Sequence, residues 1–128
     1  MRILFCIAAI AAAYLGYQHY DNQNRQNAFN TLVETIDSQP INQFELKQSL
    51  NTQVTARCQS IGTDETNLVK MEECLNIVQT YQDECELQIF RLAPVEFEDG
   101  KEARDYGKRY QKCVLSNQFT YLVDTNTL

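Results

Sequence analysis

Histidine is nearly missing from this sequence: His19 is the only one, and it precedes the region that has the composition of a folded domain. Catalysis by a serine–histidine or cysteine–histidine pair, and metal binding by histidine, need an imidazole within the site. These classes of site are therefore excluded. Glycine and proline are also scarce, with four and two residues, which argues against glycine-rich phosphate loops and long flexible linkers.

Positive charge is in deficit. Eleven Lys and Arg stand against 17 Asp and Glu, for a formal net charge of −6. A nucleic-acid-binding domain normally carries a basic face, so nucleic acid is excluded as a partner. The same excess of acid disfavours general adsorption to anionic lipid. The length of 128 residues is typical of one domain.

Cysteine pairs of the Cys-x-x-Cys type, which are typical of zinc and thiol redox sites, do not occur in the sequence. We therefore expect neither a metal nor another cofactor. Apart from Cys6 near the start, four cysteines remain: Cys58, Cys74, Cys85 and Cys113. An even number in a small exported domain predicts two structural disulfides.

Helix geometry separates the three pairings of these four cysteines. Cys74 and Cys85 lie about 16 Å apart along one predicted helix, whereas a disulfide needs Cα atoms within about 7 Å. If neighbouring helices fold back as hairpins, a Cys58–Cys85 bond would miss by more than about 20 Å. The pairs Cys58–Cys74 and Cys85–Cys113 each miss by about a turn and a half, which helix tilt can absorb. These two bonds are predicted.

A long uncharged segment opens the chain. Ile3–Tyr17 follows Met1 and Arg2 and is almost wholly apolar. As an uncleaved anchor, the segment 3–20 approaches the roughly 20 residues that cross a bilayer, with its tyrosines at the far interface. As a cleaved signal peptide, it offers Ala11–Ala13 as an A-x-A cleavage site. We favour the anchor, with Arg2 on the cytoplasmic side.

Small residues lie on one side of this apolar segment. Ala8, Ala12 and Gly16 are spaced by four, which lets two membrane helices approach closely. One interpretation is a homodimer formed through these residues. The other, which we favour, is that alanine-rich export segments contain such triplets by chance.

The sequence divides into residues 1–20, a signal-anchor or signal peptide, and residues 21–128, an exported helical domain. Apolar residues recur at helical spacing through most of the exported part. Asn42 with Glu45, and Asp99 with Glu102, predict helix starts as capping pairs. The predicted helices run from about 21 to 38, 43 to 61, 63 to 93 and 100 to 118. Residues 119–123 fit either a continued helix or a short strand.

The predicted fold is all-α: an N-terminal membrane or signal helix followed by a small, disulfide-stapled, antiparallel helical bundle. Pro40 and Gly62 end the first two helices of the bundle. The inward-facing residues are expected to be Phe29, Leu32, Val33 and Ile36; Leu46, Leu50, Val54, Cys58 and Ile61; Leu68, Met71, Cys74, Leu75, Val78, Tyr81, Cys85, Ile89 and Leu92; and Ala103, Tyr106, Tyr110 and Cys113.

Charge is unevenly distributed over the last two helices. The last helix carries Lys101, Arg104, Lys108, Arg109 and Lys112, whereas the third is rich in Asp and Glu. We favour antiparallel packing that sets these opposite charges side by side. The alternative is that the basic side docks an acidic partner or lipid headgroups.

An acidic loop precedes the last helix, with Glu96, Glu98, Asp99 and Glu102 around Gly100. Its oxygen atoms are of the kind that holds calcium, but the register of an EF-hand loop is missing. We favour an acidic turn with a helix cap.

Three aromatic residues fit no helical seam: Phe97, Phe119 and Tyr121. Aromatic anchors dominate binding energy at protein interfaces, which makes these three the candidate interface residues. For Phe97 a competing interpretation is that it folds back and plugs the end of the bundle, and this interpretation is slightly favoured.

Three functions follow from these observations. The leading one is a non-catalytic, membrane-anchored envelope protein in the periplasm, acting as an accessory or interaction subunit with a protein partner. The second is a small inhibitor or immunity-type binding protein, secreted or released into the periplasm by cleavage of the N-terminal segment. The third is a small hydrolase with a lone glutamate as its general acid.

Overall fold

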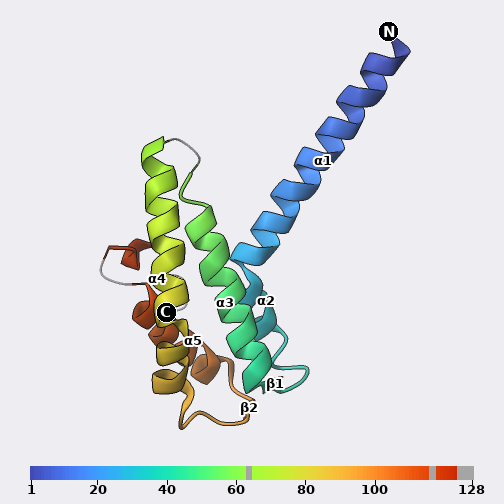
Figure 1. Ribbon diagram of the computed structural model, residues 1–128. Coiled ribbons are helices and arrows are strands. Elements are labelled where there is room, and N and C mark those ends of the chain that lie inside the picture. Colours follow the sequence, from blue (N-terminus) through green and yellow to red (C-terminus); the bar gives the residue numbers. More distant parts are fainter. Residues whose placement is uncertain (63–64, 116–117, 124–128) are drawn as a thin grey trace.

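The computed structural model describes residues 1–62, 65–115 and 118–123 (Figure 1). The described part is all-α apart from one pair of very short strands. In chain order its elements are α1 (Arg2–Gln26), α2 (Ala28–Glu34), β1 (Ile41–Asn42), α3 (Gln43–Gln59), α4 (Glu65–Phe90), β2 (Glu96–Phe97), α5 (Gly100–Val114) and a 3₁₀ turn (Thr120–Leu122). The predicted fold class is confirmed.

The N-terminal helix α1 leans out of the bundle (Figure 1). Every side chain from residue 1 to residue 20 is exposed, and no residue of α1 is fully buried. By length and composition α1 can cross a membrane, a criterion that a signal sequence also meets. Only its last turns approach α3, where Arg57 Nε donates a hydrogen bond to the carbonyl oxygen of Gln26 at 3.4 Å.

The helix predicted from 21 to 38 is divided in the structure. Residues 21–26 continue α1, the chain bends at Asn27, and α2 ends at Glu34 before a series of turns. Asn27 Nδ2 donates to the carbonyl oxygen of Gln23 at 3.1 Å, and such local side-chain bonds compete with helix. The bend turns Phe29 into the core, where its backbone N–H donates to buried Gln53 Oε1 at 3.0 Å.

The inward side of α3 is as predicted. Leu46, Leu50, Val54 and Cys58 are fully buried, and Asn42 caps the helix by accepting a hydrogen bond from Phe44 N at 2.8 Å. Beyond the end of α3, Gly62 has a φ of +131°, a backbone conformation that favours glycine.

The inward side of α4 is only partly as predicted. Cys74, Val78 and Cys85 are buried, but Tyr81 and Leu92 are exposed, Leu92 at 88%. Leu92 lies outside because α4 ends at Phe90, which takes the buried position at this end of the bundle. The predicted start of this helix at Thr63 and Asp64 lies outside the described residues. Leu68, near the described start of α4, is also exposed.

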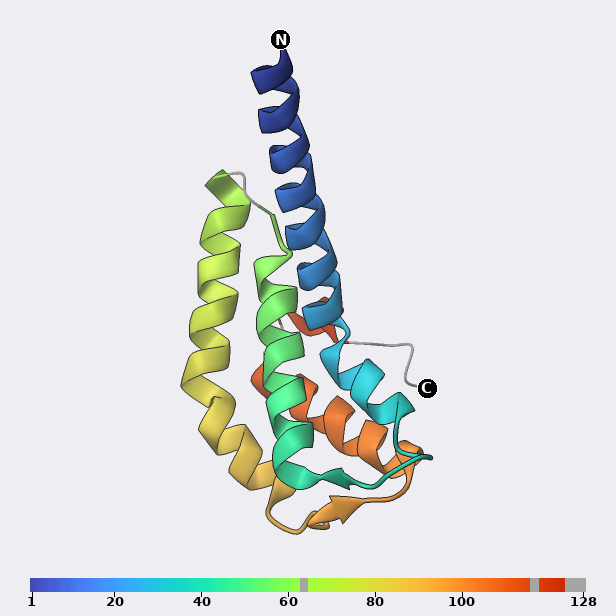
Figure 2. The same ribbon diagram turned by 90° about the vertical axis from the view of Figure 1, so that its right-hand side faces the viewer.

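The loop predicted between the last two helices contains β2, which pairs antiparallel with β1 so that Phe97 lies opposite Ile41 and Glu96 opposite Asn42. This pairing carries the chain under the bundle to α2 before α5 begins (Figure 2). Helix α5 then returns obliquely toward α4. This tilt places Cys113, near the end of α5, level with Cys85 of α4. In a strictly antiparallel hairpin the two cysteines would lie at different levels.

Both predicted disulfides are confirmed. Cys58 bonds to Cys74 with the Cα atoms 5.6 Å apart, and Cys85 bonds to Cys113 with the Cα atoms 5.8 Å apart. The first joins α3 to α4 and the second joins α4 to α5. Cys6 is exposed on α1 and unbonded.

Two of the three candidate interface residues are buried. Phe97 has no exposed surface, because its position opposite Ile41 turns it into the core, where its ring meets that of Tyr106 edge-on at 5.4 Å. Phe119 is 3% exposed. Their burial leaves these two residues little surface for a partner to contact, and the burial of Phe97 agrees with the plug interpretation. Tyr121 is 66% exposed, in the 3₁₀ turn that neither expectation for 119–123 foresaw.

The packing of α5 requires a glycine. Asp99 caps this helix through a hydrogen bond from Lys101 N at 2.9 Å, and the helix ends at Val114, four residues earlier than predicted. A Cβ at Gly107 would lie 2.3 Å from Phe29 Cζ, because α5 approaches α2 closely at this point.

Replacing Gly107 by alanine is expected to lower the free energy of unfolding by about 1–3 kcal/mol, because the Phe29 ring must shift within a packed core. A glycine-to-alanine change inside a helix ordinarily stabilises, so the sign is diagnostic. Urea unfolding followed by circular dichroism measures it. Gly16→Ala, where the Cβ meets no atom within 4 Å, is the control and should leave the stability of the bundle unchanged. A more stable Gly107→Ala variant would contradict the close approach.

Candidate functional site

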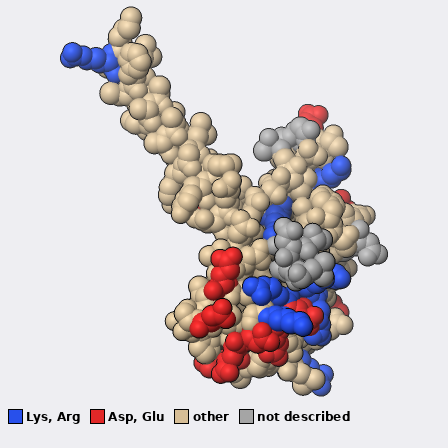
Figure 3. All heavy atoms as spheres, turned by 180° about the vertical axis from the view of Figure 1, so that it is seen from behind, with Lys and Arg blue, Asp and Glu red and all other residues tan. Residues whose placement is uncertain are grey.

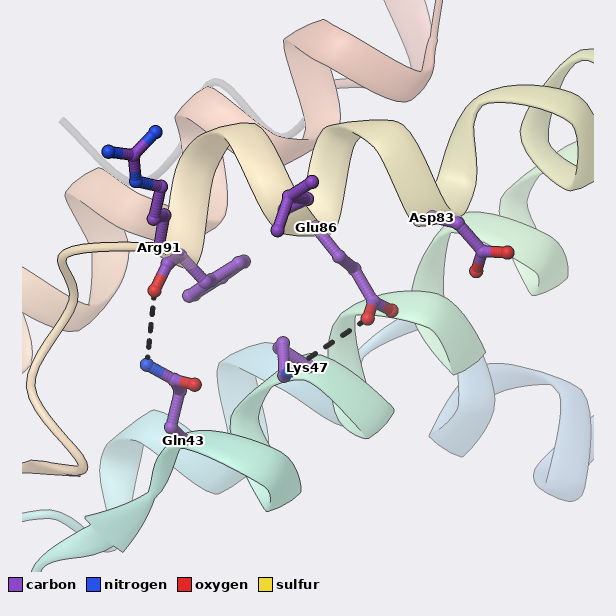
Figure 4. A pocket seen from close by; sticks show the side chains of 7 residues that line it. Gln43, Lys47, Asp83, Glu86 and Arg91 are labelled. Atoms are coloured by element: carbon purple, nitrogen blue, oxygen red, sulfur yellow. Dashed lines mark hydrogen bonds and ion pairs between the residues drawn. The ribbon is translucent and has the colours of Figure 1, made fainter.

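A surface groove runs between α3 and α4 at the end of the bundle that holds β1 and β2 (Figure 4). Its volume is about 500 Å³. A second hollow of about 330 Å³ continues it along the two helices and shares Lys47 and Glu86 with it. The first hollow is lined by Gln43, Lys47, Asp83, Glu86, Leu87, Phe90 and Arg91.

Gln43 closes one end of the groove. Its side-chain Nε2 lies 3.3 Å from each of the carbonyl oxygens of Phe90, Ala93 and Pro94. The last carbonyl groups of a helix have no partner within the helix, so Gln43 serves as a C-terminal cap for α4. Its backbone N–H also donates to the carbonyl oxygen of Val95 at 2.8 Å. The start of α3 is thereby fixed to the end of α4.

Glu86 connects the two walls of the groove. Its carboxylate accepts a hydrogen bond from Asn51 Nδ2 at 2.7 Å and lies 3.8 Å from Lys47 Nζ in an ion pair. The Tyr110 hydroxyl donates to Asn51 Oδ1, which extends the chain of contacts to α5. Burial raises the pKa of Tyr110, and the charges of Glu86 and Asp83 raise it further. The hydroxyl therefore stays protonated and remains a donor.

The groove offers limited chemistry. Both carboxylate oxygens of Glu86 are engaged with α3, and Asp83 is exposed. In the described parts of the chain, no group of three or more His, Cys, Asp or Glu side chains is placed to hold a metal ion. Within the acidic loop, Asp99 caps α5 and Glu96, Glu98 and Glu102 are exposed. The contacts of Glu86 hold α3 and α4 together. The groove therefore presents a binding surface and not a set of catalytic or metal-binding groups.

Four exposed apolar side chains surround this end of the molecule; we call them the apolar rim. They are Phe44 at 70%, Leu87 at 70%, Leu92 at 88% and Val95 at 76% exposure. Phe44 and Leu87 border the groove, and Leu92 and Val95 follow the end of α4. Single exposed apolar residues are ordinary, whereas an apolar residue on each wall of one groove, as Phe44 and Leu87 are, is typical of an interaction site.

The sequence contained a signal for part of this rim. Phe44 is two positions from Leu46 in α3 and therefore out of phase with the buried side of that helix. Leu87 is likewise two positions after buried Cys85. Neither was identified from the sequence, and Leu92 was assigned to the core.

The other predicted partner surface lies elsewhere. Ala8, Ala12 and Gly16 are exposed on α1, and no described residue of the bundle lies within 4 Å of a Cβ built at Gly16. Their role in a homodimer stays a prediction. Tyr121 is exposed beyond α5, with its ring centre 6.3 Å from that of Phe119.

The expected charge pairing between α4 and α5 does not form among the described residues. These two helices pack through Phe90, whose ring centre lies 5.7 Å from that of Tyr106 and 6.0 Å from that of Tyr110, and through the Cys85–Cys113 bond. The described ion pairs are Lys47–Glu86 and, within α5, Arg109–Asp105 at 3.9 Å. The basic residues of α5 lie on the side opposite the one that packs, which is why they miss the acids of α4.

Comparison with protein families, with characterised proteins and with solved structures finds no match to this chain. Its function is therefore inferred from the exposure of α1, the groove and the exposed side chains of the bundle. None of these depends on likeness to another protein.

Proposed function

We propose that this protein is a non-catalytic interaction subunit, anchored in a membrane by α1, with its bundle in the periplasm. The observation that carries the proposal is the exposure of α1: the almost wholly apolar segment Ile3–Tyr17 lies within this helix, and all of its side chains are exposed. A surface of this kind is stable in hydrocarbon and unfavourable in water. The helical segment 3–20 is about 27 Å long at 1.5 Å per residue, close to the roughly 30 Å of a bilayer core.

The compartment follows from two further features. Two disulfides in a small domain are typical of oxidising compartments outside the cytoplasm. Arg2 precedes the apolar segment, and positive charge favours the cytoplasmic side of a membrane helix. Both features favour a bundle on the far side of the membrane.

The binding surface that we propose is the groove with its apolar rim, and the occupant is an amphipathic helix of a protein partner. Phe44 and Leu87 offer an apolar contact on each wall, as in other helix-in-groove complexes. Asp83 is exposed at the edge of the groove and lies in no ion pair between described residues. A basic residue flanking the apolar side of the incoming helix would complement it.

The anchor is tested by the intact mass of the protein extracted from cell membranes. We expect the uncleaved chain of 14.8 kDa, resistant to alkaline extraction. Ile10→Lys places a charge in the middle of the apolar segment and should shift the protein out of the membrane fraction, because such a charge costs about 2.5–3.5 kcal/mol. Ile10→Leu is the matched control. A soluble protein that begins after residue 13 would instead support the released inhibitor.

A further inference from the structure

The basic residues of α5 share one side of that helix, on which Lys101, Arg109 and Lys112 are exposed and Arg104 and Lys108 are half-buried. Their spacing of three, seven, eight and eleven positions from the first places them on the same side. The other side, with Ala103, Gly107, Tyr110 and Val114, is buried. Arg109 pairs with Asp105 and lies over the Tyr106 ring, 5.2 Å from its centre. The other four form no ion pair with a described residue. The five are Lys101, Arg104, Lys108, Arg109 and Lys112.

Acidic side chains gather beside these bases. Figure 3 shows them on the same face of the molecule, next to the basic group. The cause is the packing of α5 on α2: a Cβ at Gly100 would lie 3.4 Å from Ile36 and 3.7 Å from Val33. The acids that neighbour these core residues therefore lie next to the start of α5. The exposed acids here are Glu34, Asp37, Glu98, Asp99 and Glu102. Together with the five bases they make up the charged face.

We propose that the charged face is the interface of a homodimer, in which the bases of each copy lie against the acids of the other. In a twofold dimer the same surface patch of both copies forms the interface, so the patch must be complementary to itself. The bases and the acids lie side by side on this one face, which is the arrangement that such complementarity needs (Figure 3). An acidic peptide or an anionic lipid surface would satisfy the bases but would be repelled by the adjacent acids.

The membrane anchor favours this arrangement, and to that extent the inference rests on the proposed function. Two copies in one membrane stand side by side, related by an axis along the membrane normal. Anchoring also raises their effective concentration, so that a weak interface can associate. Exposed ion pairs contribute little singly and are screened by salt. The dimer is therefore expected to be salt-sensitive.

The first experiment measures the association of the full chain in detergent micelles by sedimentation equilibrium. Raising NaCl from about 0.05 M to about 0.5 M should weaken association about tenfold or more, because the Debye length falls from about 14 Å to about 4 Å and the exposed charges of the two copies are screened from each other. A chain that stays monomeric at low salt would overturn the proposal. If the chain does not enter the membrane, the proposed anchor fails, while this measurement, made on the soluble chain, still decides the dimer.

The second experiment exchanges charges between two variants. Lys108→Glu with Lys112→Glu, and separately Glu34→Lys with Asp37→Lys, should each weaken self-association about 100-fold, because like charges then face each other. Mixing the two variants should restore association to within about tenfold of the native chain, because each half-interface is again complementary. Thermal melting of each variant confirms that it folds. The control is Lys70→Glu, because Lys70 is an exposed residue of α4 outside the charged face, and this variant should leave self-association unchanged.

Failure of the mixture to associate would overturn the homodimer. So would a native chain that is monomeric yet binds a polyglutamate probe through Lys108 and Lys112. That outcome would assign the bases to an acidic partner instead.

Discussion

Replacing Phe97 by alanine is expected to lower the free energy of unfolding by about 3–5 kcal/mol, which is a large part of the stability of a small domain. The Phe97 side chain has no exposed surface and lies opposite Ile41 in the strand pair. Its ring also meets Tyr106 edge-on. Truncation leaves a cavity between the strand pair and α5, and the surrounding side chains are held on rigid elements that close it only in part.

The matched control is Val95→Ala, two residues earlier. Val95 is 76% exposed, so its truncation should change the stability by less than about 0.5 kcal/mol. Urea unfolding of the full chain in detergent, followed by circular dichroism, compares the two variants at equal disulfide content. A loss below about 1 kcal/mol for Phe97→Ala would mean that Phe97 does not plug the bundle, and would restore it as a candidate for binding.

The parts of the fold that follow from local pattern were predictable. Leu46, Leu50, Val54 and Cys58 lie three or four positions apart, and a helix with such spacing buries one side whatever its neighbours are. The disulfide pairing followed from the rise per residue and from the assumption that neighbouring helices fold back as hairpins, because the wrong pairs then fail by distances that no tilt corrects.

The break after α1 was not predictable from pattern. No glycine or proline occurs between Gly16 and Pro40, and the helical spacing of Phe29, Leu32, Val33 and Ile36 begins directly after the bend at Asn27. What ends α1 there is the burial of Phe29 against Gln53, a residue 24 positions away. The pairing of β1 with β2 also depends on residues that are far apart in the sequence. It brings together Ile41 and Phe97, and two-residue strands leave no alternating pattern to recognise.

The exposed residues of α4 show a third limit. Apolar residues at helical spacing indicate which side of a helix can be buried. The helices that pack against that side decide how much of its length is buried. Helix α4 has 26 residues, whereas α3 has 17 and α5 has 15. The described helices therefore cover the longer helix over only part of its length, and Leu68 near its start is exposed. The groove was likewise beyond sequence reasoning, because its central ion pair joins Lys47 to Glu86 across two helices.

Removal of the Cys85–Cys113 bond by a double alanine substitution is expected to lower the free energy of unfolding by about 3–4 kcal/mol. The bond closes a separation of 28 residues, and the unfolded chain gains the corresponding loop entropy when it is lost. The bond also fixes the end of α5, so its loss should loosen the contact between Tyr110 and Asn51.

Removal of the Cys58–Cys74 bond is expected to cost slightly less, about 3 kcal/mol, because it closes a separation of only 16 residues. Cys6→Ala is the control, since Cys6 is unbonded and exposed on α1, outside the bundle. Urea unfolding of the three variants in detergent gives the order of stability, and peptide mapping without reductant identifies the linked pairs in the native chain. A Cys74–Cys113 peptide would overturn the arrangement of α3, α4 and α5, because that bond needs the end of α5 near the start of α4. Equal stability of all three variants would show that packing alone holds these helices, and that the disulfides add nothing to the bundle.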